Sequence, residues 1–251
     1  MKKLILQILL VLLGCTSLWA ADFWDKKGYK EWKEKEVLKM LSKSPWAQNV
    51  NLDSNQFRSG AFKDAFPDAP GGGGGIGGMG GGGGLAGGGG GGGGGSGVGT
   101  GGIRRGRRGP PPIKLTVRWV SALPVKQAMV RSRHKGNFEE TEQEQKFLKE
   151  TNKQYVVSIS PLPSRMARGL LDTDLIQEVT SLYRKNKEPI LAESVKVLTR
   201  EGFAELILFF PRIEEITLDN KNVELRTELG PAKIKRKFKL KDMRVQRKLE
   251  L

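Results

Sequence analysis

Few side chains in this sequence are of the types that carry covalent or metal chemistry. Cys15 is the only cysteine and His134 the only histidine among the 251 residues. A single cysteine excludes an intramolecular disulfide and a multi-cysteine metal site. Every histidine-dependent triad or zinc site would have to use His134, which lies in a basic stretch where we expect an exposed side chain. The sequence therefore predicts no catalytic residue, no metal site and no cofactor.

Carboxylates are the remaining candidates for acid/base chemistry. Asp172 and Asp174 are separated by one residue, and Asp174 stands three residues before Gln177. That spacing matches an N-cap and the N3 position of a helix, so capping and the helix dipole explain both aspartates without catalysis. A carboxylate-dependent hydrolase that uses Asp172, Asp174 or Asp219 stays a third hypothesis, and it requires these carboxylates to meet in the fold.

A second acidic cluster could suggest a cation site. It consists of Glu139, Glu140, Glu142 and Glu144. A calcium loop needs oxygen ligands at fixed positions around a glycine turn, and this spacing does not supply them. We interpret the cluster as the solvated face of a charged helix over residues 138–150.

Basic residues favour a different kind of chemistry. The formal net charge is +16, or +14 once Lys2 and Lys3 leave with a signal segment. A short basic segment contains Arg104, Arg105, Arg107 and Arg108. We interpret it as a solvated hinge in front of the prolines at 110–112. The alternative is contact with a polyanion, whether anionic lipid, polysaccharide or nucleic acid.

The first twenty residues predict export. Lys2 and Lys3 precede an apolar run over 4–13 that is too short to span a bilayer, which is typical of a signal peptide. Cleavage after Ala20 would release a periplasmic or secreted protein. In the alternative, residues 12–15 act as a lipoprotein box and a lipidated Cys15 brings the chain into contact with a membrane. The expected partner is an acidic component of the cell envelope.

A glycine tract divides the rest of the chain. Residues 71–102 contain 25 glycines in 32 positions, which bring no side chains to bury, so we expect a disordered coil. The predicted organisation is a signal peptide at 1–20, a helix and strand segment at 21–70, a disordered Gly-rich and Arg/Pro-rich insertion at 71–112, and a β-rich main domain at 113–251.

The segment before the tract needs a hydrophobic partner. Residues 34–42 have the apolar spacing of a helix that ends before Pro45, and Trp46 follows at once. A helix this short is marginal alone, so we expect it to dock on the main domain. The upstream aromatic residues are Phe23, Trp24, Tyr29 and Trp32. We interpret them as core, with a carbohydrate or partner platform as the alternative.

The main domain alternates apolar and polar residues in several stretches, which predicts strands. Leu206 to Phe210 is continuously apolar and should form a central strand covered on both faces. A helix from Asp174 should bury a stripe that includes Leu182 and Tyr183. Short strands are expected at 216–218 and on either side of Gly230.

The last two strands permit a prediction of register. Matching their apolar faces places Leu225 opposite Phe238 and leaves residues 230–233 as the loop. Glu228 would then face Lys235, Glu224 would face Lys239, and Arg226 would face Lys237. The lysine row is interpreted as an outer sheet face rather than a ligand site, although a polyanion could still use it.

Three motifs carry a family resemblance: Ser44-Pro45-Trp46-Ala47, the stretch Val117–Val125, and Phe238–Met243 near the C-terminus. In these the chain resembles a family of exported bacterial proteins, known mainly from soil bacteria, that has no assigned function. The resemblance implies export and a single domain, and it supplies no catalytic residues.

Together these observations predict an α+β fold with a mostly antiparallel sheet and two or three helices, interrupted by a disordered Gly-rich insertion. The first functional hypothesis is an exported, non-enzymatic envelope protein with a binding or structural role. The second is a polyanion-binding module.

Overall fold

The computed structural model describes residues 22–54, 111–134, 136, 138–150, 153–163, 166, 172–200 and 202–251. Cys15, the glycine tract and the arginines at 104–108 lie outside these residues. The described residues form eleven strands, mostly antiparallel, and five α-helices, which confirms the α+β prediction. Two of the helices have six residues or fewer.

Five strands make the larger sheet, in the order β1-β2-β3-β7-β6, with every neighbouring pair antiparallel. Their bounds are β1 Ala47–Leu52, β2 Ile113–Trp119, β3 Gln154–Pro163, β6 Ser194–Arg200 and β7 Phe203–Pro211. Along β2 the residues Leu115, Val117 and Trp119 are buried, and the residues between them are exposed or intermediate. The period-two pattern of the sequence therefore places one apolar face of this sheet on the core.

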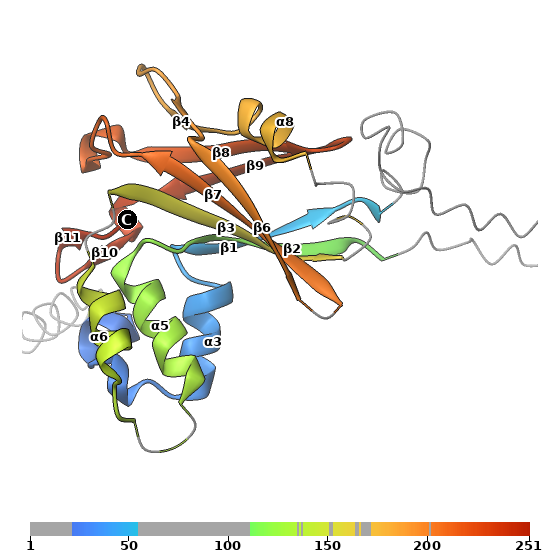
Figure 1. The fold of residues 1–251 in the computed structure, drawn as a ribbon. Helices are drawn as coiled ribbons and strands as arrows, with labels where there is room; N and C mark the ends of the chain where they lie inside the picture. Colours follow the sequence, from blue (N-terminus) through green and yellow to red (C-terminus); the bar gives the residue numbers. More distant parts are fainter. Residues whose placement is uncertain are drawn as a thin grey trace, which may run out of the picture.

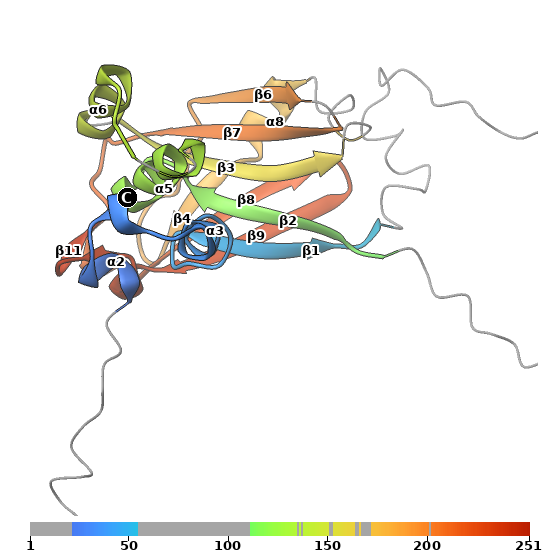
Figure 2. The same cartoon turned by 90° about the horizontal axis from the view of Figure 1, so that it is seen from below.

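A second, antiparallel sheet has the order β5-β4-β8-β9. The bounds are β4 Ser181–Arg184, β5 Ile190–Leu191, β8 Asn222–Leu229 and β9 Ala232–Lys239. A small ladder, β10 Arg244–Val245 with β11 Lys248–Leu249, follows β9. Figures 1 and 2 show the two larger sheets facing each other across the core.

The core between the sheets is aromatic at its centre. Trp119 of β2 meets Phe238 of β9 edge-to-face at 5.6 Å between ring centroids, and Tyr155 of β3 at 5.8 Å. The edge strands β1 and β9 also lie side by side, since the Gln48 amide donates to the backbone oxygen of Lys237 at 3.1 Å. The two sheets therefore meet along this edge.

The helices α3, α5 and α6 cover one end of the larger sheet, on the side away from the second sheet, whereas α8 lies apart from them, next to β6 and β8 (Figure 1). The bounds are α2 Phe23–Lys26, α3 Glu34–Ser42, α5 Leu123–Arg133, α6 Glu142–Lys149 and α8 Thr173–Glu178. The α5 helix has no clear apolar stripe in its sequence, which mixes apolar residues with basic, polar and small ones. It begins at Leu123-Pro124 because proline is tolerated in the first helical turn, where its missing N–H is not needed.

The segment before the glycine tract contributes to this same core. Val37 and Met40 of α3 are buried in the cluster that also contains Trp119 and Phe238. Trp46 has no exposed surface, and its indole N–H donates to the backbone oxygen of Glu250 at 2.7 Å. Residues on both sides of the tract are therefore packed in one hydrophobic interior.

The predicted register of the last hairpin is wrong by two residues. Leu225 lies opposite Arg236, and Val223 lies opposite Phe238. Only Gly230 and Pro231 separate the strands, and Gly230 has φ +58°, which suits the first central position of a tight type II′ turn. The faces are as expected because a shift of two residues preserves the side to which each side chain points.

The charge pairs change with the register. Glu228 lies opposite Lys233, with 3.2 Å between carboxylate and ammonium, and Glu224 lies opposite Lys237. Lys235 faces Arg226 and makes the repulsive pair of this face.

Other sequence expectations also fail. The α8 helix ends at Glu178, and Leu182 and Tyr183 belong to β4, because β4 pairs with β8 over a long sequence separation. The apolar strand β7 is the fourth of five, and Ile207 and Phe209 on its other face are only half-buried. The β3 strand continues past Pro161 and ends at Pro163, with a register shift between Ile159 and Leu162 that accommodates Pro161.

The short strand expected at 216–218 does not form. Ile216 is buried within a loop, and a 3₁₀ turn, Leu218–Asn220, follows it. Asn220 closes this turn by accepting the N–H of Thr217 on its side-chain oxygen at 3.0 Å.

The burial of Trp46 leads to a stability prediction. Trp46→Ala should lower the free energy of unfolding by about 3–5 kcal/mol, because it empties a large buried site. Trp46→Phe keeps an aromatic ring but removes the N–H that donates to the Glu250 backbone oxygen. It should lower the free energy of unfolding by about 1–3 kcal/mol. Urea denaturation followed by circular dichroism measures both.

A matched control lies on the neighbouring helix. Leu38 is 58% exposed, so Leu38→Ala should change the free energy of unfolding by no more than about 0.5 kcal/mol. Equal effects of Trp46→Ala and Leu38→Ala would contradict the burial of Trp46.

Candidate functional site

One hollow bounded by described residues has a volume of about 880 Å³ and a basic lining. We call it the basic groove. Seven cationic side chains line it: Lys39, Lys43, Lys237, Lys239, Lys241, Arg244 and Arg247. Three carboxylates also line it: Asp22, Asp25 and Asp242. Cations therefore outnumber anions by more than two to one.

Three parts of the chain bring these cations together. Lys39 belongs to α3 and Lys43 follows its last residue. Strand alternation turns Lys237 and Lys239 of β9 outward, because Phe238 between them fills the core. Arg247 is placed by the turn between β10 and β11, and the backbone N–H of Gln246 in the same turn donates to the Asp25 carboxylate at 2.9 Å.

The cations of the groove are not neutralised by the described part of the protein. Within the described ranges, no ion pair up to 4.0 Å involves any of the seven cations or the three carboxylates. Lys237, Lys239 and Lys241 are all exposed. A set of unpaired cations on a rigid strand and its flanks attracts an anion without first having to break internal pairs.

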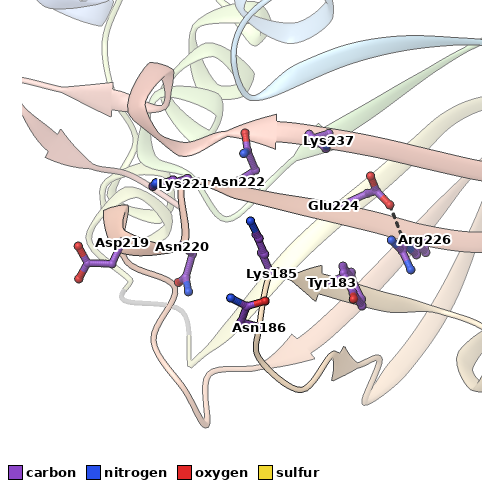
Figure 3. Close-up of a pocket in the computed structure, with 10 residues that line it drawn as sticks. All are labelled: Tyr183, Lys185, Asn186, Asp219, Asn220, Lys221, Asn222, Glu224, Arg226 and Lys237. Atoms are coloured by element: carbon purple, nitrogen blue, oxygen red, sulfur yellow. Dashed lines mark hydrogen bonds and ion pairs between the residues drawn. The ribbon is translucent and has the colours of Figure 1, made fainter.

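A second hollow, of about 540 Å³, lies on the outer face of the four-stranded sheet. Figure 3 shows ten residues around it, with Tyr183 and Arg226 at one end and Asp219 and Asn220 at the other. The guanidinium carbon of Arg226 lies 3.8 Å from the centroid of the Tyr183 ring, and its Nε donates to Glu224 at 2.6 Å. We call it the tyrosine pocket.

The two hollows adjoin. Lys237 lines both the basic groove and the tyrosine pocket, since it projects from the outer face of β9 between them. The outer face of β8 and β9 therefore continues from one hollow into the other.

Only some of the site residues expected from the sequence lie within the described part of the chain. Cys15 and the arginines at 104, 105, 107 and 108 lie outside the described residues, so both expectations stay predictions. Asp172 caps α8 by accepting the N–H of Leu175 at 3.2 Å, a role that the sequence assigned to Asp174. Asp219 lines the tyrosine pocket, and neither Asp172 nor Asp174 lines it with Asp219. Asp219 therefore does not share this pocket with the two other aspartates named in the hydrolase hypothesis.

The sequence predicted exposed side chains for His134 and Glu144, and the structure corrects both expectations. The Glu144 residue is buried, and both of its carboxylate oxygens lie 3.0 Å from Nε2 of His134. Thr141 donates its backbone N–H to the same carboxylate at 3.1 Å and caps α6 with its hydroxyl. The hydrogen bond from the Thr141 backbone and the contact with His134 lower the pKa of Glu144. This carboxylate therefore closes a helix start and is not a free cation ligand.

The aromatic residues before the tract are mostly buried. Trp24, Trp32 and Trp46 are at most 7% exposed, and Phe23 packs edge-to-face on the first two of them. The alternative of a carbohydrate or partner platform at these tryptophans is therefore wrong.

A buried lysine was not anticipated from the sequence. Lys126 of α5 donates to the backbone oxygens of Phe147 and Glu150 at 3.3 and 2.9 Å, and burial lowers its pKa. It satisfies carbonyls at the end of α6, which explains its position without catalysis.

Comparison of the chain with protein-family models, with curated proteins and with solved structures gives no match. Among the described residues, histidine and acidic side chains form no group of three that could hold a metal ion. None of the helices in the described ranges has the length and apolarity needed to cross a membrane.

The Glu144 contacts lead to a prediction of pH dependence. Folding lowers the pKa of Glu144 below 4.5, the ordinary value for a glutamate. The Glu144 carboxylate therefore stabilises the fold fully above pH 4.5, and this contribution is lost as the pH falls through the lowered pKa. Glu144→Gln should reduce stability at pH 7 and make it less dependent on pH below 4.5. Urea denaturation from pH 3 to pH 7 measures this.

Glu142→Gln is the control for this prediction, since Glu142 is exposed at the first position of the same helix. It should keep the wild-type pH dependence. If Glu144→Gln and Glu142→Gln follow the same curve, the assigned role of Glu144 is wrong.

Proposed function

We propose that this protein is a non-enzymatic binding protein that holds a polyanion in the basic groove. The observation that supports the proposal is the convergence of seven cations from three chain segments, without an ion pair among the described residues. Because like charges on a compact surface repel, such a group is stable only when solvated or when an anion lies against it. Binding should then fall steeply as salt rises.

The groove also changes the expected binding residues. The sequence pointed to the arginines at 104–108, whereas the described part of the fold provides lysines on α3 and β9 and arginines near the C-terminus. Two of the seven cations, Lys237 and Lys239, belong to the lysine row that the sequence analysis interpreted as an outer sheet face.

Export is the second part of the proposal. The apolar run at 4–13 behind Lys2 and Lys3 supports a signal peptide, and an acidic component of the cell envelope is the partner that suits such a location. The intact mass of the exported protein tests this directly. Cleavage after Ala20 gives one mass, and retention of a lipidated Cys15 gives a larger one. Recovery of an uncleaved cytoplasmic chain contradicts export.

Binding is tested with the full chain and polyphosphate as the probe. The triple variant Lys237→Gln, Lys239→Gln, Lys241→Gln should weaken binding on the order of 10- to 100-fold at low salt. It should reduce the slope of log K against log salt by about 2 to 3, because three phosphate contacts are lost. Fluorescence anisotropy over a salt series measures both quantities.

The matched control removes the same charge elsewhere. Lys35, Lys114 and Lys153 are exposed and line neither hollow. Their triple glutamine variant should bind polyphosphate within about twofold of the wild type if binding is local to the groove. A fourth protein, with glutamine at 104, 105, 107 and 108, measures the contribution of the arginine segment. Equal losses in the two lysine triples would show non-specific attraction and overturn the proposal.

A further inference from the structure

In the tyrosine pocket, the guanidinium of Arg226 is held in place but its two terminal nitrogens have no protein acceptor among the described residues. Its Nε is held by Glu224 at 2.6 Å, and the guanidinium is stacked over Tyr183. The two terminal nitrogens of Arg226 have no hydrogen bond to any described residue, and 41% of the side chain is exposed. A guanidinium fixed on one edge and on one face, with its fork open, is preorganised to bind a carboxylate through two parallel hydrogen bonds.

Neutral hydrogen-bonding groups lie farther along the pocket from this arginine (Figure 3). Asn186 and Asn222 line the same pocket, and their side-chain amides make no hydrogen bond within the described residues. A primary amide both donates and accepts, as does each hydroxyl of a sugar. Arg226 covers one face of the Tyr183 ring, and the rest of this side chain, which is 40% exposed, adds apolar surface to the pocket. A carboxylate, several hydroxyls and a partly apolar ring face are the features of a uronic acid residue.

The pocket and the groove disfavour two other polyanions. Nucleic acid binding without base readout uses several aromatic rings on which successive bases stack. Tyr183 is the only exposed aromatic residue that lines either hollow in the described ranges, since Trp24 is 7% exposed. A lipid surface would need exposed apolar side chains beside the cations. Leu38, Leu191 and Ile213 are exposed, but none of them lines these hollows.

We propose that the tyrosine pocket is a subsite for a uronic acid, and that the polyanion is an acidic polysaccharide. The carboxylate of one sugar binds Arg226, hydroxyls of the following sugars contact Asn186 and Asn222, and the polymer passes Lys237 into the basic groove. This inference rests on the proposed function, because the groove supplies most of the attraction and the pocket supplies the choice of polymer.

The experiment compares two probes on the full chain. Oligogalacturonate carries carboxylates and sugar rings, whereas polyphosphate carries charge alone. Arg226→Lys retains the positive charge but loses the planar fork, so it should weaken oligogalacturonate binding about tenfold and change polyphosphate binding less than twofold. Tyr183→Ala should have the same selectivity. Isothermal titration calorimetry measures the affinities, and circular dichroism checks that each variant is folded.

Lys233→Gln is the control. Lys233 lies on the same outer face of β9 as Lys237, is paired with Glu228, and lines neither hollow. It should leave both affinities within about twofold. The groove triple variant should weaken both probes.

The outcomes separate this inference from the function on which it rests. If polyphosphate binds through the groove but Arg226→Lys affects both probes alike, or if oligogalacturonate does not bind, the uronic acid subsite is wrong and the polyanion function stands. If neither probe binds the wild type, both proposals are wrong.

Discussion

The structure depends on the burial of Trp46 between segments that are far apart in the chain. Its backbone oxygen accepts the N–H of Trp119 at 2.8 Å, its indole donates to Glu250, and its ring packs edge-to-face on Trp24 at 5.4 Å. One residue, through its backbone and its side chain, therefore joins the N-terminal segment, the larger sheet and the last residues of the described chain. A buried indole needs a partner for its N–H, and Glu250 supplies that partner only when the last segment is in place.

The same convergence creates the basic groove. Because the segment with Trp46 lies beside β9, the end of α3 comes close to the outward lysines of that strand. Phe238 binds the strand to the core, and its two neighbours Lys237 and Lys239 are consequently turned to solvent. The apolar residues that stabilise this edge thus also hold the cations in register, so the charge is displayed on a rigid support.

Much of the secondary structure could be predicted from local patterns. Alternation located β2 and the faces of β8 and β9, since the period of a strand is set by its own backbone. Local patterns did not locate the end of α8, because Leu182 and Tyr183 suit a helical stripe as well as a strand, and only the pairing of β4 with β8 decides between them. The hairpin register failed for a related reason. The faces match at two registers, and the tight turn at Gly230 selects one.

By itself, the sequence determined the quantities that depend on composition and local period: an excess of positive charge, a lack of residues for triads or thiolate metal sites, and the apolar faces of the elements. Tertiary structure decided which cations meet, why Glu144 is buried against His134, and how Arg226 comes to lie on Tyr183. The physical reason is that a local pattern sets the direction of a side chain relative to its own backbone. The neighbours of that side chain depend on strand order and register, which are fixed only when distant segments pack together.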